Sequence, residues 1–494
     1  MTEQQGDQRH LETLDRDLAR YSNLEMATSY VSRPMIGVGI SLVFVLLAGI
    51  IAMLFFGHEN NSLIVIIAAC LGAYMALNIG ANDVANNMGP AVGANALSMG
   101  GAIAIAVIFE SAGALLAGGD VVKTVAKGII APESMGNSSV FVWAMMAALL
   151  SASLWVNLAT WVGAPVSTTH SVVGGVMGAG IAAAGFSAVN WATMSGIVAS
   201  WVISPVLGGV IAALFLWLIK SRIIYRDDKI AAARKWVPVL VGIMAGVFSA
   251  YLALKGLKKI IKIDMPTALL IGAAIGALVW IVMIPVIRKQ SQGLENRNKS
   301  LKVLFGVPLV VSAALLSFAH GANDVANAVG PLAAIVQASQ SGNFTDAIGI
   351  PIWVMVIGAF GISFGLFLFG PKLIRMVGGQ ITKLNPMRAY CVALSAAITV
   401  IVASWLGLPV SSTHIAVGAV FGVGFFREWD AERRIRNARL AMPDRTAFAP
   451  EERRRRKLVR RSHFMTIIAA WIITVPAAAI LSAVIFYLIS SVTA

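Results

Sequence analysis

Gly80-Ala-Asn-Asp-Val-Ala-Asn-Asn-Met-Gly-Pro90 occurs twice in this chain, the second time as Gly321-Ala-Asn-Asp-Val-Ala-Asn-Ala-Val-Gly-Pro331. Nine of the eleven positions are identical in the two copies, which we call the first and second Asn-Asp motifs. Each copy follows an apolar run, residues 63–77 and 304–318, so its aspartate and asparagines arrive at about membrane depth. Charged groups are costly there and usually functional. The repetition therefore predicts a functional centre built from both copies.

The composition is that of a polytopic membrane protein. Of the 494 residues, 58% are hydrophobic and 12% charged, which is far more apolar than an ordinary soluble domain. We expect an all-α chain with about 12 to 13 transmembrane helices, because runs of roughly 20 apolar residues recur along it. The net charge of +15 comes mainly from connections between these runs, as in retained cytoplasmic loops, so it does not indicate nucleic-acid binding. The predicted spans are 35–56, 62–79, 100–118, 139–161, 163–183, 192–219, 236–254, 266–287, 303–319, 351–370, 389–406, 408–425 and 464–490.

A second pair of motifs indicates duplication of a larger unit. Gly163-Ala-Pro-Val-Ser-Thr-Thr-His170 is matched by Gly407-Leu-Pro-Val-Ser-Ser-Thr-His414. The two pairs of motifs are offset by 241 and 244 residues, which is nearly the same distance. A common offset predicts two copies of one structural unit.

The distribution of basic residues predicts that the two copies are antiparallel. The connection 427–462 is rich in arginine, whereas its counterpart 184–191 has no Lys or Arg; likewise 220–235 is basic and 332–350 is not. Because basic loops stay in the cytoplasm, corresponding loops fall on opposite sides, which is the inverted-repeat plan of secondary transporters with broken helices and hairpins. The lysine-rich link 255–265 is the exception, since it falls on the external side.

These patterns predict a multi-pass protein of the cell membrane with a cytoplasmic N-terminus and an external C-terminus. The expected organisation is a polar extension at 1–34, an extra helix within 35–61, a first repeat at 62–219, basic loops with two transmembrane helices at 220–302, and a second repeat at 303–494 that includes the basic loop 427–462.

The Asn-Asp motifs offer oxygen and amide groups alone, which suit a hard cation such as sodium better than zinc or copper. Their glycines and Gly-Pro pairs should interrupt the helix and free backbone carbonyls as further ligands. The alternative is that these residues merely cap a helix after a turn. The predicted cation-binding residues are Asn82, Asp83, Asn86, Asn323, Asp324 and Asn327.

The second pair of motifs places hydroxyl groups directly after a proline, at what should be the first turn of a helix. Free backbone N–H groups and hydroxyls there can bind an oxyanion without a fixed positive charge, so the anion can leave again. The alternative is that these side chains cap or bond back to their own helices. The candidate anion-binding residues are Ser167, Thr168, Thr169, Ser411, Ser412 and Thr413, which we call the first (167–169) and second (411–413) hydroxyl turns.

Four further titratable residues lie in apolar surroundings. His170 and His414 are candidates to bond the anion or relay a proton, or else they form an interhelical contact. Glu110 is a carboxylate on an apolar helix and a candidate for cation coupling or for bracing the fold. His320 has no partner in the first copy, where Ile79 takes its place, and we assign it a weaker role.

At these residues the chain resembles the inorganic phosphate transporter family, whose members carry both motifs in each half. The resemblance covers about residues 62–490 and implies symport of inorganic phosphate with sodium or protons, an inverted-repeat helical fold and often a homodimer. It also implies that the Asn-Asp motifs, with sodium at Asp83 and Asp324, are cation sites, that the hydroxyl turns are the phosphate site, and that Glu110 is the family's glutamate after Ile-Phe. No cofactor is expected besides the coupling ion.

Two departures keep alternatives open. Many relatives carry a further glutamate where this chain reads Tyr390-Cys-Val-Ala-Leu394, which leaves room for proton coupling. Gly118-Gly-Asp-Val-Val-Lys-Thr124 resembles sulfate permeases of the same superfamily, so sulfate is the alternative to phosphate as the substrate. An anion channel would give less reason for cation sites. An intramembrane hydrolase would need one asymmetric set of groups, whereas the motifs come in pairs, so we expect no enzyme activity.

Overall fold

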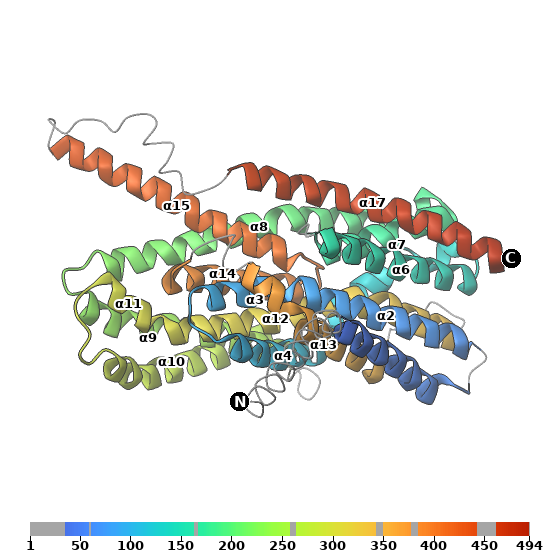
Figure 1. Cartoon of the computed structure of the whole chain (residues 1–494), viewed down its shortest axis with the longest axis horizontal. Coiled ribbons are helices and arrows are strands. Elements are labelled where there is room, and N and C mark those ends of the chain that lie inside the picture. Colours follow the sequence, from blue (N-terminus) through green and yellow to red (C-terminus); the bar gives the residue numbers. More distant parts are fainter. Residues whose placement is uncertain are drawn as a thin grey trace, which may run out of the picture.

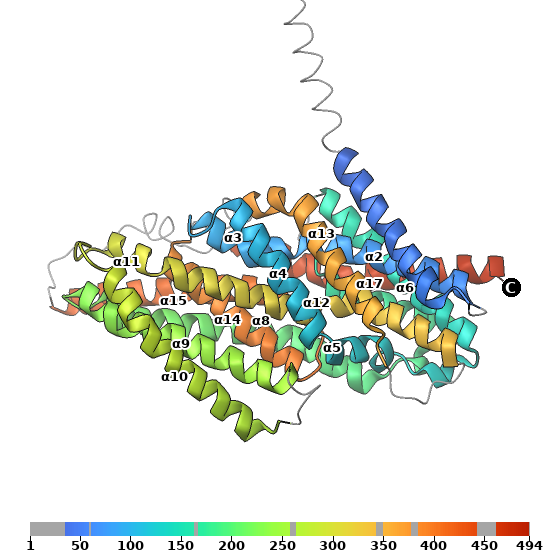
Figure 2. The same ribbon diagram turned by 90° about the horizontal axis from the view of Figure 1, so that it is seen from below.

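The computed structural model describes residues 35–58, 61–162, 166–256, 263–341, 349–376, 384–441 and 461–493, and these are almost entirely helical (Figures 1 and 2). Eleven of their helices are long and apolar enough to cross a membrane, which confirms an all-helical polytopic protein. The elements are a first helix Met35–Phe56, α2 Ser62–Asn82, α3 Val84–Gly93, α4 Met99–Ala117, α5 Gly119–Lys123, η1 Thr124–Gly128, η2 Pro132–Met135, α6 Ser138–Val162, α7 Thr168–Ala184, η3 Phe186–Ala188, α8 Trp191–Ile219, η4 Lys220–Ile224, α9 Lys229–Lys255, α10 Met265–Gln290, α11 Asn298–Leu304, α12 Gly306–Ser341, α13 Ile352–Met376, α14 Pro386–Trp405, α15 Ser412–Ala441 and α17 Arg461–Thr493.

The predicted spans that do not appear among these eleven are the second arms of two hairpins. In hairpin 1, α6 is followed by α7, which has 17 residues; in hairpin 2, α14 is followed by α15, which has 30. Both second arms begin at buried residues inside the protein. Helix α7 is therefore shorter than a membrane-spanning helix, and α15 reaches its length only through a charged C-terminal part. The predicted loop 427–462 is therefore helical as far as Ala441. Residues 442–460, like the extension 1–34, lie outside the described residues.

The helix interruption predicted for both Asn-Asp motifs is present in the first copy only. There α2 ends at Asn82 and α3 begins at Val84, whereas α12 runs through the whole second motif without a break. The motif glycines instead allow close packing: a Cβ atom on Gly80 would lie 1.9 Å from the carbonyl oxygen of Ile362, and one on Gly321 would lie 2.1 Å from that of Glu110. Glycine is required because a neighbouring backbone approaches here, and the helix does not need to end.

The contacts between helices exchange partners between the two halves. Helix α17 follows α15 in the chain but packs against α7, and α8 follows α7 but packs against α15 (Figure 1). The closest approaches repeat this exchange, since Gly174 meets the backbone of Val475 and Gly418 meets that of Pro205. Such reciprocal contacts are what a two-fold relation between two copies produces. They support the predicted duplication, and the opposite orientation of the copies in the membrane stays a prediction.

Helices α9 and α10, from the predicted connecting segment, form an antiparallel pair at one edge of the bundle (Figure 2). Helix α10 contacts mainly α9, through glycines of both helices whose neighbours are backbone atoms. Helix α9 in turn contacts α4, α12 and α14, so the pair lies beside the two repeats.

Candidate functional site

The two Asn-Asp motifs meet in the centre of the protein. Asp83 lies between α2 and α3, and Asp324 lies in the middle of α12; their side chains are 2% and 1% exposed. Asp83, Asp324 and His320 each offer one ligand atom, and these three atoms lie within 4.8 Å of one another. The two carboxylates therefore share one closed site.

Both hydroxyl turns reach the same carboxylates. The hydroxyl groups of Thr168 and Thr413 donate hydrogen bonds to the two oxygens of Asp83, with O–O distances of 2.6 and 3.3 Å. The Ser412 hydroxyl donates to Asp324 Oδ2 at 3.4 Å. The starts of α7 and α15 thus converge on the Asp83–Asp324 pair from two hairpins.

The second asparagine of each motif reaches the hairpin of the other copy. Asn86 donates to the Thr413 hydroxyl at 2.9 Å, and Asn327 donates to the Thr169 hydroxyl at 3.1 Å. In turn, Thr169 donates to the carbonyl oxygen of Val410 at 3.1 Å. These hydrogen bonds join the two copies at the centre. A change in one hydroxyl turn therefore alters the hydrogen bonding of the Asn-Asp motif in the opposite half.

The first asparagine of each motif braces a hairpin of its own copy. Asn82 donates to the carbonyl oxygen of Val166 at 3.3 Å. The Asn323 side chain donates to the carbonyl oxygen of Leu408 at 3.1 Å and accepts from the amide of Val410 at 3.1 Å. The geometry gives Asn323 a structural task in holding the turn of hairpin 2.

Two of the six predicted hydroxyl residues cap helices. Ser167 accepts from the amide of His170 at 3.2 Å, and Ser411 accepts from the amide of His414 at 3.3 Å. The capping alternative thus describes these serines, while Thr168, Thr413 and Ser412 bond the carboxylates. Because α7 and α15 begin here, the positive ends of two helix dipoles point into the site.

Some oxygens of the second motif have no donor. Among the described residues, Asp324 Oδ1 and Asn327 Oδ1 are buried without a hydrogen-bond partner. Pro331 lies in α12 four residues after Asn327 and lacks the N–H that would bond the Asn327 carbonyl; Pro90 has the same relation to Asn86 in α3. Buried oxygens without donors are costly unless a ligand satisfies them, and oxygen is the ligand atom that hard cations prefer.

A chain of polar side chains extends from one side of the site. Asn87 donates to Glu110 Oε1 at 2.9 Å, Glu110 Oε2 lies 2.6 Å from His320 Nδ1, and His320 Nε2 lies 3.0 Å from Asp324 Oδ2. Glu110 is therefore connected to the site, and its role in cation coupling or in bracing the fold stays a prediction. Sequence reasoning gave His320 too small a role and missed Asn87. A signal for His320 was present, because residues four apart share a helix face and His320 precedes Asp324 by four.

His170 and His414 lie directly behind the hydroxyl turns and contact each other. Their ring centroids are 4.4 Å apart in an edge-to-face arrangement, and the His170 ring lies 3.8 Å from that of Trp201 in α8. The two histidines end the two matching motifs. Ser111 and Ser363 each follow the residue whose carbonyl oxygen faces a motif glycine, and their hydroxyl oxygens are 2.8 Å apart. Contacts between equivalent residues are what a two-fold relation between the copies would produce, and that relation stays a prediction.

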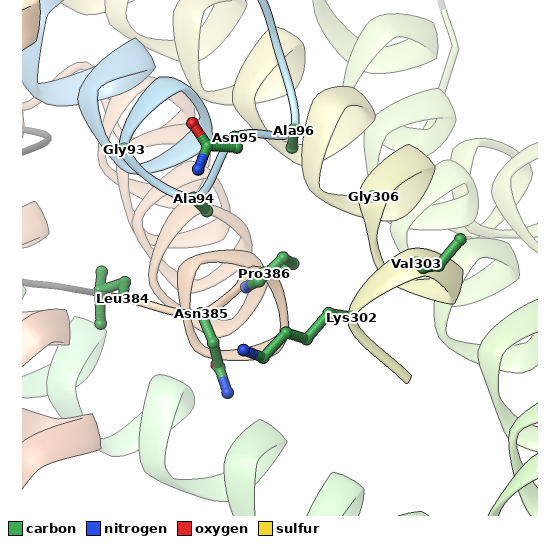
Figure 3. A pocket seen from close by; sticks show the side chains of 10 residues that line it. All are labelled: Gly93, Ala94, Asn95, Ala96, Lys302, Val303, Gly306, Leu384, Asn385 and Pro386. Carbon is green, nitrogen blue, oxygen red and sulfur yellow. The ribbon is translucent and has the colours of Figure 1, made fainter. Parts of the chain in front are cut away.

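An open cavity of about 750 Å³ lies at the end of α3 remote from Asp83 (Figure 3). Its polar lining comes from Asn95, Lys302 and Asn385, the last at the start of α14. No residue of the Asp83–Asp324 site lines it. The site itself is closed in this structure, since the carboxylates and hydroxyl turns are buried.

Comparison with known proteins gives the same family as the motifs. The model of the phosphate transporter family matches residues 79–482, which include both Asn-Asp motifs and both hydroxyl turns. The chain belongs to the phosphate transporter family. The resemblance stated from the sequence is therefore confirmed.

Family members are similar over nearly the whole chain. A protein of Helicobacter pylori named "Putative phosphate permease" is 45% identical over 95% of this chain and 98% of its own length. The chloroplastic inorganic phosphate transporter 2-1 of Arabidopsis thaliana is 36% identical over 84% of this chain and 70% of its own length. A solved structure described as "The sodium-dependent phosphate transporter" matches with a TM-score of 0.77 and 35% identity, and covers 86% of this chain and 99% of that one.

Proposed function

We propose that this phosphate transporter family member is a secondary active symporter that imports inorganic phosphate across the cell membrane, driven by a sodium or proton gradient. The observation that carries the proposal is the buried centre in which Asp83 and Asp324 meet the starts of α7 and α15. Carboxylates suit a cation, and helix N-termini with hydroxyls suit an oxyanion. A symporter needs both kinds of site at one place.

The cation site consists of the carboxylates with the second asparagines. Asp324 Oδ1 and Asn327 Oδ1 are the oxygens that lack donors and would gain most from a bound cation. The solved family member described as sodium-dependent favours sodium as the coupling ion. The Glu110–His320 contact offers a second route by which a proton could be carried.

The anion site consists of the two hydroxyl turns, which carry no Lys or Arg. Thr168 and Thr413 now direct their hydroxyl hydrogens at Asp83. A cation that coordinates Asp83 satisfies the carboxylate oxygens and lets the hydroxyls turn to phosphate. This exchange of partners gives a physical reason for coupling, because the anion site is complete only when the cation is present.

Phosphate is preferred to sulfate on chemical grounds. At neutral pH phosphate still carries a proton and can donate a hydrogen bond, whereas sulfate is an acceptor only. A buried carboxylate beside the hydroxyl turns, such as that of Asp324, can accept this hydrogen bond from phosphate, whereas it only repels sulfate. Sulfate transport is the second candidate, favoured by the segment 118–124, and an anion channel or an enzyme has less support from the paired site.

The predicted membrane orientation, with the N-terminus in the cytoplasm and the C-terminus outside, and a homodimeric state belong to the same proposal. The loop charges support the orientation. The homodimer is what the family resemblance implies. The closed site also fits one intermediate of alternating access, in which the halves rock about a fixed centre.

Uptake of radiolabelled phosphate into proteoliposomes tests the proposal. We expect uptake to follow an imposed sodium or proton gradient, and excess unlabelled sulfate to compete weakly. Uptake that is indifferent to both gradients would contradict symport, and equal competition by sulfate would contradict the preference for phosphate. Empty liposomes and the Asp324→Asn protein are the controls.

A further inference from the structure

The turn between the arms of hairpin 2 is held from outside the site by an ion pair that belongs to neither motif. Lys255, the last residue of α9, pairs with Asp120 of α5 and also donates to the carbonyl oxygen of Trp405 at 3.2 Å. Trp405 is the last residue of α14, where helix carbonyls have no intrahelical partner. The lysine thus ties the end of α14 to α5.

The adjoining π-helical segment makes a second tie to the same turn. Thr124, where α5 passes into η1, donates to the carbonyl oxygen of Gly407 at 2.7 Å. Gly407 has a φ of +70°, and a Cβ atom on it would lie 3.4 Å from the Thr124 hydroxyl. On its other side, Asn323 holds Leu408 and Val410. The turn is therefore clamped between α12 and the α5–η1 segment.

The clamped turn leads directly into the second hydroxyl turn. Val410 is fully buried and immediately precedes Ser411, the cap of α15. The turn therefore lies between the ties to Lys255 and Thr124 on one side and the start of α15 on the other. The Lys255 side chain is 10% exposed and that of Asp120 is 39% exposed, so water reaches the pair and can replace its bonds when the turn moves.

We propose that Lys255 and Asp120 are positioning residues that lock this turn as a gate on one side of the anion site. The inference deepens the proposed transport function and rests on it for its purpose. It also explains a lysine that the loop charges left unexplained: Lys255 belongs to a basic link predicted on the external side, and here its charge is paired within the protein. With the predicted orientation, the gate faces outward.

Thiol labelling of Val410→Cys, in a Cys70→Ala/Cys391→Ala background, tests the gate without requiring transport. An impermeant maleimide is added to right-side-out and to inside-out membrane vesicles. We expect Lys255→Met to raise the labelling rate about fivefold, as loss of roughly 1 kcal/mol from the closed state would, and from one side only. Lys289→Met, which removes an exposed lysine of α10, should leave the rate unchanged.

The exchanged variant Lys255→Asp/Asp120→Lys distinguishes an ion pair that holds the turn from a general structural role of the two side chains. We expect it to restore much of the slow labelling that either single change loses. Equal rates from both sides, no change in Lys255→Met, or no recovery in the exchanged pair would overturn the gate. If labelling behaves as expected while the wild-type protein moves no phosphate, the gate stands and the transport proposal fails. If uptake follows an ion gradient but Lys255→Met does not alter labelling, the transport proposal stands and the gate fails.

Discussion

The two sides of the central site come from nearly identical motifs yet differ in chemistry. Beside Asp324, His320 contacts Glu110, which contacts Asn87. The positions equivalent to these three polar residues are apolar: Ile79 replaces His320, Ile362 replaces Glu110 and Ala328 replaces Asn87. The equivalence of Glu110 and Ile362 follows from their packing, since each meets the motif glycine of the opposite copy.

The carboxylates consequently have different partners. Both oxygens of Asp83 accept hydrogen bonds from hydroxyl groups, whereas Asp324 has His320 and the longer Ser412 bond on one oxygen and no donor on the other. A duplicated motif can therefore divide its tasks, because residues outside the motif set the surroundings of each carboxylate. We expect the Asp324 side to respond most to the coupling ion and the Asp83 side to hold the hydroxyl turns.

Removing either negative charge gives the largest expected effect. Asp83→Asn and Asp324→Asn should each lower coupled phosphate uptake about hundredfold or more, because a cation site at membrane depth loses a ligand worth roughly 3 kcal/mol. Uptake in proteoliposomes measures this, and thermal melting in detergent shows whether each protein is folded. Wild-type uptake in either variant would contradict the cation assignment.

The polar chain beside Asp324 distinguishes the two sides most directly. Glu110→Ile removes one of the two carboxylate partners of His320 and the acceptor of Asn87, and should destabilise the protein by about 3 kcal/mol; His320→Ile leaves Glu110 with Asn87 alone and should cost about as much. The double variant Glu110→Ile/His320→Ile replaces this pair by the residues of the apolar side, leaves Asn87 as the remaining polar difference, and should regain stability to within about 1 kcal/mol of wild type.

Uptake measured on the same proteins separates folding from coupling. We expect the double variant to melt like wild type but to lose the response of uptake to a proton gradient. Ile362→Leu, which conserves volume on the apolar side, is the matched control. Additive destabilisation in the double variant would show that the Glu110–His320 contact does not matter.

The motif glycines test what the two sides have in common. Gly80→Ala and Gly321→Ala should each cost about 2 kcal/mol of stability, because the added methyl would overlap a carbonyl oxygen of the facing helix. Gly100→Ala, with open space around its Cα, is the control. Melting temperatures measure the effect, and a much larger loss at one motif glycine than at the other would contradict the reciprocal packing.

Single hydroxyl deletions give the smallest expected effects. Thr413→Val removes a bond to Asp83 and one from Asn86, and should weaken phosphate uptake about tenfold at low substrate concentration. Ser412→Ala removes one longer bond to Asp324 and should cost about threefold. The initial rate against phosphate concentration measures both, and an effect of Ser412→Ala larger than that of Thr413→Val would reverse the roles given to the two sides.

The sequence predicted the helical membrane fold, the duplication and the paired motifs that meet at the centre, but not the part of His320 and Asn87. These follow from local signals, namely apolar runs, repeated words and polar groups inside apolar segments. The sequence did not predict that α12 is unbroken, because a glycine such as Gly321 can either end a helix or allow another backbone to pack closely. The second use applies here because the backbone of Glu110 lies against Gly321, and this contact is visible only in the structure. The exchange of α8 and α17 and the pairing of Lys255 with Asp120 depend on contacts between distant segments, which no local pattern specifies.

Phosphate affinity measured by calorimetry in detergent, over a series of sodium concentrations and pH values, tests the central claim most directly. If the Asp83–Asp324 site binds the coupling cation beside the anion, affinity in the wild-type protein rises about tenfold or more with sodium or proton concentration. In Asp324→Asn that dependence should be lost. A wild-type affinity that stays the same at every sodium concentration and pH would contradict the account.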